Sequence, residues 1–521
     1  MNKQLRYTIR ISLIVALGGF LMGFDASVIS GVVKFIEPEF QLTKLQVGWA
    51  VSSLTFTATL AMMLAGPLSS AFGRKVILKY AAVLYAVSAL SSAFAPNFTL
   101  LVIARMIGGF GVGASLIIAP MYIAEISPAK MRGRMVSFNQ LNIVLGISVA
   151  FFTNYLILKF GQSESNWTLA LGLDKYNWRW MLGLETLPAV MYFAFLFFVP
   201  ESPRWLIMKN RIPEAGVILK KVSSEDQAQK DIEAVQASIS DESKKQKVPI
   251  SELFKPALKL VLIIGIVIAV LQQITGINSV FFYAPMIFEQ SGIGTDSSFS
   301  QAILVGLTNL VFTVLAIMFI DKFGRKVLLV FGVSGIAISM FLLAWGFHSA
   351  TYTLTEASIK SLPENIEISK IAHLTGETFH SDLAFKTAMQ ESLGTEEANE
   401  FESDLLAAAA NMNTLLILIC IIGFVASFAI SLGPVMWVLF SEIFPNYIRG
   451  LAISFVGLIN SGVSFLVQLV FPWELSNLGS APTFLIYGLF AAVGLVFIII
   501  KLPETKGKSL EELQAVLVKK D

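Results

Sequence analysis

The chain has 521 residues, of which 55% are hydrophobic and only 14% are charged, and its net charge is +2. Soluble domains carry about 25% charged residues, so this composition excludes an ordinary soluble protein. The near-neutral charge gives no indication of nucleic-acid binding, and we expect no such partner. The single cysteine, Cys420, excludes an intrachain disulfide.

Strongly apolar stretches recur along the whole chain, and about 20 such residues suffice for a helix to cross a bilayer. Lys3 and Arg6 precede the first stretch, which continues without a small-residue cleavage site, so we expect it to act as its own insertion signal. The predicted spans lie near residues 9–33, 46–70, 77–95, 99–122, 136–158, 181–199, 259–288, 301–320, 327–347, 413–440, 450–472 and 482–500.

Basic clusters fall on alternate loops between these spans. Examples are Arg74 with Lys75, Arg204 with Lys209, and Arg325 with Lys326. Loops rich in Lys and Arg stay in the cytoplasm, so we expect these loops and both termini on that side. The predicted location is the plasma membrane, as the inner membrane of a bacterium.

The chain also repeats itself. Phe72-Gly73-Arg74-Lys75 returns as Phe323-Gly324-Arg325-Lys326, and Pro200-Glu201-Ser202 returns as Pro503-Glu504-Thr505. An internal repeat in an apolar chain is typical of a transporter with two homologous bundles. We predict a first six-helix bundle at residues 1–200 and a second at 258–521, which ends in a short cytoplasmic tail. A cytoplasmic linker at 201–257 joins the two bundles. It is expected to contain short amphipathic helices at Ala215–Val222 and Asp231–Ile239.

The two halves differ by one long insertion. The second copies of the repeated motifs, Gly324 and Glu442, stand much farther apart than the first copies, Gly73 and Glu125. The additional residues fit only at 348–412, between the ninth and tenth spans, and the alanines at 407–410 predict a closing helix that runs into the tenth span. All three histidines lie in or beside this insertion without the tight spacing of a metal site, so we expect no metal.

Several longer motifs together resemble the sugar porter family of the major facilitator superfamily, including bacterial proton–pentose and proton–hexose symporters and glucose facilitators. They are Gly23-Phe24-Asp25 with the residues that follow to Gly31, Arg105 in Ala-Arg-Met-Ile-Gly-Gly, Pro120 to Glu125, Pro200 to Leu206, Gln272 to Asn278, Gly433 to Trp437 and Pro503 to Gly507. The resemblance implies an all-α membrane protein with twelve transmembrane helices in two pseudo-symmetric six-helix bundles. It also implies import of a monosaccharide, a hexose or a pentose, with a proton by alternating access, by a monomer without a cofactor.

Polar side chains inside the spans indicate where a sugar could bind, because amides both donate and accept hydrogen bonds. Trp437 adds an aromatic face for the C–H side of a sugar ring. The candidate binding residues are Gln140, Gln272, Gln273, Asn278, Asn309, Trp437 and Asn460. The alternative is that such amides only bond neighbouring helices. The resemblance favours binding, but Met22, Ile147, Phe282 and Asn460 depart from the pentose symporter pattern and leave the sugar open.

Asp25 in the first span and Arg105 in the fourth are the candidate proton-coupling residues. An ionised Asp is costly in hydrocarbon, so it should pair or take a proton. The resemblance implies that the two residues meet and that protonation of Asp25 loosens the pair. The alternative is a static ion pair in a sugar uniporter.

The repeated charges at the cytoplasmic face either only set the topology as solvated charges or form an inner gate, and the resemblance favours the gate. Isolated exposed ion pairs contribute little, but a network that spans two halves can bias a two-state element. The candidate gate residues are Arg74, Glu125, Arg132, Glu201, Arg325, Glu442, Arg449 and Glu504.

Three other functions compete with proton-coupled import. A facilitative uniporter differs only in proton flux. A sugar sensor on a transporter scaffold would usually add a long cytoplasmic tail, and only a short segment follows the last span. A membrane-embedded enzyme lacks support, because no histidine lies in the spans outside the region of the insertion to activate a nucleophile. We therefore expect a transporter and no enzyme.

Overall fold

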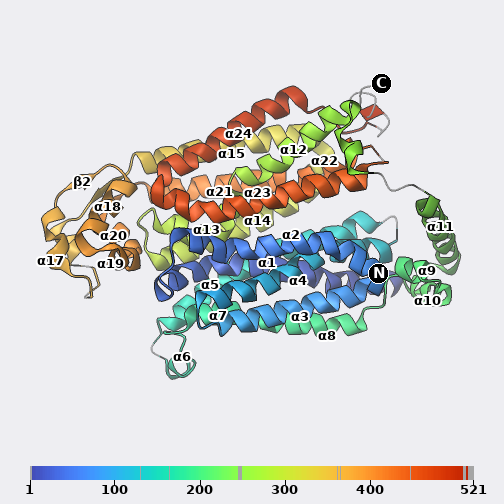
Figure 1. The fold of residues 1–521 in the computed structure, drawn as a ribbon, viewed down its shortest axis with the longest axis horizontal. Coiled ribbons are helices and arrows are strands. Elements are labelled where there is room, and N and C mark those ends of the chain that lie inside the picture. Colours follow the sequence, from blue (N-terminus) through green and yellow to red (C-terminus); the bar gives the residue numbers. More distant parts are fainter. Residues whose placement is uncertain are drawn as a thin grey trace. The chain divides into compact units, whose positions relative to one another are not determined.

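The computed structural model describes residues 3–128, 131–163, 165–244, 249–360, 362–363, 365–445, 447–508 and 512–513. Within these ranges the chain is almost entirely helical, as Figure 1 shows. Twelve of the described helices, continuous or broken, are long and apolar enough to cross a membrane. The predicted fold class of twelve transmembrane helices is therefore confirmed.

The first half contains six of these spans, and the sixth of them is broken. Its helices are α1 (Lys3–Glu39), α2 (Lys44–Phe72), α3 (Arg74–Ala93), α4 (Phe98–Ile126), α5 (Arg132–Gly161), α6 (Asn166–Ala170), α7 (Asn177–Gly183) and α8 (Thr186–Phe195), followed by a 3₁₀ turn at Leu196–Phe198. Helix α6 is a short surface turn, whereas α7 and α8 form one span interrupted near Glu185.

The linker begins with three helices that pack as a small amphipathic group. They are α9 (Pro203–Met208), α10 (Ile212–Val222) and α11 (Glu225–Lys244), followed by 3₁₀ turns at Ile250–Phe254 and Pro256–Leu258. Leu219 of α10 and Ile232 of α11 belong to the same buried apolar cluster as the first-half spans. Helices α10 and α11 lie where the sequence predicts the two short amphipathic helices of the linker.

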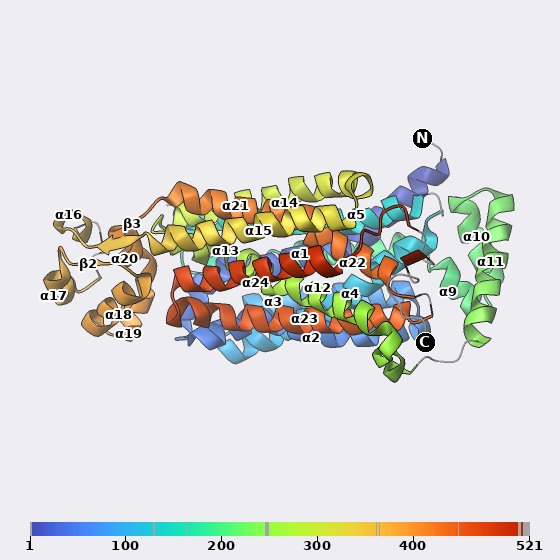
Figure 2. The same ribbon diagram turned by 90° about the horizontal axis from the view of Figure 1, so that it is seen from above.

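The second half repeats the arrangement with two broken spans. Its membrane helices are α12 (Lys259–Ile274), α13 (Ile277–Glu289), α14 (Thr295–Phe323), α15 (Arg325–His348), α21 (Thr414–Ile430), α22 (Leu432–Ile443), α23 (Arg449–Asn477) and α24 (Ser480–Lys501). Figure 2 shows α15 beside α24 and α12 beside α23, and these pairs are in contact. The breaks lie at Gly276 and Ser431, where the backbone leaves the helical region.

The insertion folds as a small subdomain with its own core. Its elements are β1 (Thr351–Thr353), α16 (Glu356–Ile359), α17 (Ile368–Ile371), a 3₁₀ turn at Ala372–Leu374, β2 (Thr378–Phe379), α18 (Asp382–Leu393), α19 (Thr395–Glu400), α20 (Glu402–Ala409) and β3 (Ala410–Asn411). The strands form one antiparallel sheet in the order β2-β1-β3. Tyr352 of β1 stacks on Phe385 of α18 at the centre of the buried cluster, with 5.7 Å between ring centroids.

The predicted helix through the alanines into the tenth span is wrong at its end. Helix α20 stops at Ala409, and Ala410 pairs with Tyr352 as part of the sheet. A new helix, α21, then begins at Thr414, where the side chain of Asn413 accepts a hydrogen bond from the Leu416 amide at 3.0 Å. Strand pairing and this cap therefore separate the insertion from the span.

The chain divides into two compact units that do not coincide with its two halves. Unit 1 comprises residues 1–26, 53–150 and 179–249, and unit 2 comprises 27–52, 151–178 and 250–521. Unit 2 thus joins the second half to one end of α1, of α2 and of α5. Inside it, Lys34 of α1 pairs with Glu289 of α13 at 2.7 Å, and Trp49 of α2 packs on Phe465 of α23. The division into segments 1–200, 201–257 and 258–521 stays a prediction.

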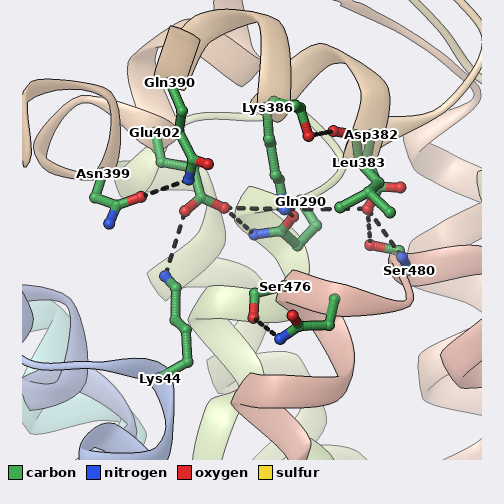
Figure 3. Close-up of polar contacts among 12 residues, drawn as sticks. Lys44, Gln290, Asp382, Leu383, Lys386, Gln390, Asn399, Glu402, Ser476 and Ser480 are labelled. Atoms are coloured by element: carbon green, nitrogen blue, oxygen red, sulfur yellow. Dashed lines mark hydrogen bonds and ion pairs between the residues drawn. The ribbon is translucent and has the colours of Figure 1, made fainter. Parts of the chain in front are cut away.

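Charged side chains also bind the insertion to the spans of unit 2. Lys44 at the start of α2 contacts Glu37 of α1 at 2.6 Å and Glu402 of α20 at 3.4 Å (Figure 3). Glu402 also accepts from Lys386 at 3.0 Å, and Asp382 accepts from the backbone and hydroxyl of Ser480 at the start of α24. The insertion is therefore fixed to α2 and α24 by buried or half-buried polar contacts.

We expect Glu402→Gln to lower the melting temperature of the purified protein at pH 7. Burial opposes ionisation of Glu402, but Lys386 and Lys44 outweigh it and hold the pKa of the carboxyl well below its usual range. A folded-state pKa below the unfolded value of about 4.3 stabilises the protein above that pH, and this stabilisation is lost as the pH falls. The difference between wild type and variant should therefore shrink below about pH 4. Glu391→Gln, at an exposed site on α18, is the control, and a pH-independent difference would contradict this account.

Candidate functional site

The first candidate site is a buried ion pair between α1 and α4. Arg105 Nη1 donates to Asp25 Oδ1 at 3.2 Å, and the two side chains are 2% and 3% exposed. The prediction that the two residues meet agrees with this geometry. Asp25 Oδ2 has no hydrogen-bond partner among the described residues, so half of this carboxylate remains available to a proton.

The backbone of α4 lets the carboxylate approach this closely. A Cβ added at Gly108 would lie 2.9 Å from Asp25 Oδ2 and 2.5 Å from the hydroxyl of Ser88. Any larger residue at this position would push the carboxylate away from α4. Gly108 therefore allows the free oxygen of Asp25 to lie against the helix that carries its partner.

Glu185 is a second buried acid at this site, which the sequence reasoning missed. It is 2% exposed, lies at the break between α7 and α8, and interacts electrostatically with Asp25 and Arg105. Its Oε1 also has no hydrogen-bond partner among the described residues. Glu185 is the only charge in the predicted span 181–199, so the rule that identified Asp25 applies to it as well.

This group of charges can hold a proton. One guanidinium balances one carboxylate, and a second ionised carboxylate in hydrocarbon would be costly. Asp25 and Glu185 face the single cation Arg105, each with a free oxygen. The arrangement therefore offers a place for a proton that neutralises one acid while the other remains paired.

The second candidate site is a cluster of amides at a broken span. Gln272 and Gln273 end α12, and Asn278 lies in the first turn of α13. Between them Gly276 has φ 89°, a left-handed conformation that glycine adopts without strain. Discontinuous membrane helices of this kind form substrate and ion sites in transporters, because the break exposes polar groups at membrane depth.

Hydrogen bonds join these amides into one network with α23. Gln273 Nε2 donates to Gln272 Oε1 and to Asn460 Oδ1, each at 3.1 Å. Asn278 Nδ2 donates to Gln273 Oε1 at 2.7 Å and to Ser464 Oγ at 2.6 Å. Four of the predicted sugar residues therefore lie together, and Ser464 is an additional member that the sequence reasoning missed.

The network also reaches the second break. Gln272 Nε2 donates at 3.0 Å to the carbonyl oxygen of Leu432, next to Ser431. Asn460 Nδ2 donates to Gln272 Oε1 and to the carbonyl oxygen of Ala269, both at 2.8 Å. The amides thus use their donors and acceptors on one another and on the backbone, and a ligand would exchange these bonds for its own hydroxyls.

Three predicted sugar residues lie outside this network. Asn309 of α14 is buried, and its Oδ1 accepts from Thr313 at 3.5 Å. Trp437 of α22 is 47% exposed and packs edge-on against Phe440. Gln140 of α5 is exposed and belongs to unit 1.

The repeated charges form two clusters of matching geometry. In unit 1, Arg74 contacts Glu125 at 3.0 Å, and the carboxylate of Glu201 accepts from the Arg74 amide at 3.0 Å. Ser202 also donates to Glu125. Arg132 Nε donates to the carbonyl oxygen of Ala124 at 3.0 Å.

The cluster in unit 2 repeats these bonds. Arg325 contacts Glu442 at 2.8 Å, and Glu504 accepts from the Arg325 amide at 2.9 Å. Thr505 donates to Glu442 at 2.6 Å, and Arg449 Nε donates to the carbonyl oxygen of Phe444 at 3.2 Å. All eight predicted gate residues therefore belong to two equivalent clusters.

The backbone conformation and the lack of space for a side chain explain the glycine in each repeated motif. Gly73 has φ 107° and Gly324 has φ 91°, which side chains rarely adopt. A Cβ at Gly324 would lie 2.8 Å from the carboxylate of Glu504, and one at Gly73 would collide with Glu201. Each glycine lets an acid from a distant segment cap the helix that follows.

The two capping acids differ electrostatically. Burial raises the pKa of Glu201, although the backbone amides of Ser202, Lys75 and Arg74 act in the opposite direction. Burial also opposes ionisation of Glu504, but there the amides that it accepts from prevail, and its pKa is lowered. The two copies therefore have equivalent geometry, but the surroundings disfavour the ionised carboxylate at Glu201 and favour it at Glu504.

Comparison with known proteins identifies the family. The pattern of the family described as "Sugar (and other) transporter" matches residues 11–363 and 402–517. The chain belongs to this family. It is accordingly a multi-pass membrane transporter of the major facilitator superfamily, and most of its insertion lies between the two matched ranges.

Several characterised relatives align along nearly the whole chain. The "Arabinose-proton symporter" of Bacillus subtilis is 32% identical and covers 99% of this chain and 97% of its own length. The "D-xylose-proton symporter" of Escherichia coli is 33% identical with the same coverage of 99% and 97%. The "Glucose transporter GlcP" of Staphylococcus epidermidis is 32% identical and covers 97% and 96%.

Solved structures of a xylose transporter share the fold. Its inward-open form from Escherichia coli has a TM-score of 0.73 and 32% identity and covers 98% of this chain and all 100% of the other. The proton:xylose symporter bound to 6-bromo-6-deoxy-D-glucose has a TM-score of 0.70, 32% identity, and coverage of 99% and 100%.

Proposed function

We propose that this protein imports a monosaccharide together with a proton by alternating access, and that it catalyses no enzymatic reaction. The relatives named for arabinose–proton and xylose–proton symport support this function. A glucose transporter of similar identity keeps both pentoses and hexoses as candidate substrates.

The observation that carries the proposal is the buried pair of Asp25 and Arg105 beside Glu185. We assign the proton to Asp25, whose Oδ2 is free, and assign Arg105 as its partner. Protonation of Asp25 would remove its attraction to Arg105 and leave Glu185 as the remaining anion near the guanidinium. A charge rearrangement inside one bundle can in this way be linked to a change of conformation.

The sugar is assigned to the amide network and its surroundings. Gln272, Gln273, Asn278 and Asn460 supply donors and acceptors, which match neutral hydroxyl groups. Gln140, Asn309 and Trp437 complete the proposed binding set. Trp437, which is 47% exposed, would offer its ring face to the sugar.

Sugar-driven proton uptake by vesicles that contain the purified protein tests this function. D-xylose, L-arabinose and D-glucose are added in turn outside the vesicles, and the internal pH is followed with an entrapped dye. Acidification with one of these sugars is the expected result. Sugar entry without acidification would instead identify a facilitative uniporter.

Alternating access requires the two ends of the transporter to open in turn. The ion pair of Lys34 with Glu289 and the packing of Trp49 on Phe465 support closure at the outer end. We propose that the clusters around Arg74 and Arg325 close the inner end in the opposite state. The basic residues at these clusters support a cytoplasmic location for this end and for both termini. The bacterial relatives support a location in the plasma membrane. We further propose that the functional unit is a monomer.

We expect Glu442→Ala to shift the population toward the state that is open to the cytoplasm. The change removes the partner of Arg325 and the acceptor of Thr505, and with them part of the proposed inner gate. A single cysteine introduced near the inner end, in a Cys420→Ser background, should therefore react faster with maleimide. Glu214→Ala, which removes an exposed pair with Arg211, is the control, and equal labelling rates in Glu442→Ala and wild type would refute the gate.

A further inference from the structure

A polar cavity lies where the insertion meets the spans of unit 2. It has a volume of about 250 Å³ and is lined by α18 to α20 on one side and by α2, α13 and α23 on the other. Figure 3 shows Gln390, Asn399 and Glu402 on the insertion side and Lys44 and Ser476 on the opposite side. Pockets for drug-sized ligands measure about 300–1,000 Å³, so this cavity suits a smaller molecule.

The charged groups of the cavity are already paired with one another. Glu402 contacts Lys44 at 3.4 Å and Lys386 at 3.0 Å, and Lys44 also contacts Glu37 at 2.6 Å. A charged ligand would have to break one of these pairs and leave its partner uncompensated. The cavity therefore favours a neutral ligand.

The remaining polar groups both donate and accept. Gln390 Nε2 donates to Asn399 Oδ1 at 3.1 Å, and the side-chain Oε1 of Gln390 and Nδ2 of Asn399 form no further bond among the described residues. Thr387 lines the insertion side of the cavity, and Asn477 lines the opposite side. Pro472 and Leu475, on the same helix as Asn477, present an apolar surface. Hydroxyl groups around a ring with apolar C–H faces match this mixture, which is the chemistry of a monosaccharide.

Helix α23 connects the cavity to the amide network. Asn460, Ser464, Gln468, Pro472 and Ser476 follow one another at four-residue intervals, so each lies about one turn from the next, and the row winds around the helix by about 40° at each step. Gln468 donates to Ser464 at 2.8 Å, and Ser464 accepts from Asn278 in the network. Polar side chains thus lead from the network along α23 as far as Gln468, four residues before Pro472 of the cavity lining.

Helix α13 forms a second connection. Asn278 of the network and Met286 of the cavity wall lie on this helix eight residues apart, a rise of about 12 Å. Near Tyr283 the helix is kinked, and the Tyr283 hydroxyl donates to the Gln468 carbonyl at 2.8 Å. Two of the three helices that hold the network, α13 and α23, therefore also line the cavity.

We propose that this cavity is a second monosaccharide site, which receives the sugar at the outer end before it reaches the amide network. The inference rests on the proposed function, because it takes the transported sugar as the ligand. It assigns the insertion a role in substrate binding, with Gln390, Asn399 and Asn477 as its hydrogen-bonding residues.

Protection of a cysteine from labelling tests the site. Thr387→Cys is introduced into a Cys420→Ser background, and the intact purified protein reacts with a maleimide in the presence of D-xylose or D-glucose. Labelling should slow by the factor 1 + [L]/Kd, which is about threefold when the sugar is at twice its Kd. Glycine betaine at the same osmolality should give no protection, and Glu396→Cys, exposed on α19, should react at the same rate with and without sugar.

Two further variants separate the cavity from the amide network. Protection should persist in Gln273→Leu, which disables the network, and should disappear in Gln390→Leu combined with Asn477→Leu. The proposal is overturned if neither sugar protects Thr387→Cys, or if protection disappears with Gln273→Leu, because the change would then be conformational. Failure of the proposed function is seen separately, as the absence of sugar uptake by vesicles.

Discussion

Asp25→Asn is expected to abolish sugar-driven proton uptake and concentrative transport while sparing exchange of sugar for sugar. Asn keeps the shape of the side chain and can still accept from Arg105, which lies 3.2 Å from Asp25 Oδ1, but it cannot take up a proton. One proton in a membrane potential of 100 mV supplies about 2.3 kcal/mol, enough for roughly 50-fold accumulation. In vesicles the variant should reach only equal concentrations inside and outside.

Two companion variants make this result specific. Asp296→Asn removes a carboxylate that pairs with Lys159 at the exposed surface, and it should leave accumulation unchanged. Glu185→Gln tests the neighbouring acid directly. If Glu185→Gln abolishes proton uptake and Asp25→Asn retains it, the proton belongs to Glu185 and our assignment is wrong.

The apolar stretches of the sequence predicted all twelve spans, because the bilayer excludes polar residues from a membrane helix regardless of how that helix packs against the others. It did not predict where the spans break. At Ser431 the backbone has φ −125° and ψ −96°, and the freed Leu432 carbonyl is satisfied by Gln272 from another helix. Such a break is maintained by a tertiary contact, which no local pattern in the tenth span reveals.

Local sequence patterns also failed to predict the structure of the insertion. Its short elements are defined by a small core around Tyr352 and Phe385 rather than by strong periodicity. The alanines at 407–410 favour a helix locally, but pairing of Ala410 with Tyr352 ends it. Strand pairing between distant residues overrides helix propensity here.

The sequence predicted some residues of the two candidate sites and missed others. Rare polar residues in apolar spans identified Asp25, Arg105 and the four bonded amides. The same rule applied to Glu185 and was not used there, whereas Ser464 gives no such signal because serine is common in membrane helices. The spatial relations of Gln140, Asn309 and Trp437 to the sugar depend on packing that residue type alone does not specify.

Gln273→Leu is expected to weaken sugar binding by roughly 5- to 150-fold. Gln273 has three partners in the amide network, since it donates to Gln272 and Asn460 and accepts from Asn278. Removal of a buried hydrogen-bonding group leaves its partners unsatisfied, at a cost of about 1–3 kcal/mol. A titration of the purified protein with its transported sugar measures the affinity.

The matched control replaces another buried amide side chain, far from the network in sequence, by leucine. Asn154 of α5 is 1% exposed and donates to the Val28 carbonyl at 2.9 Å. Asn154→Leu should lower the melting temperature and leave the affinity of the folded protein unchanged. If Gln273→Leu folds and binds the sugar as tightly as wild type, the amides serve only to join α12, α13 and α23. The substrate would then have to bind through Trp437, Asn309 and Gln140, whose side chains lie outside the network.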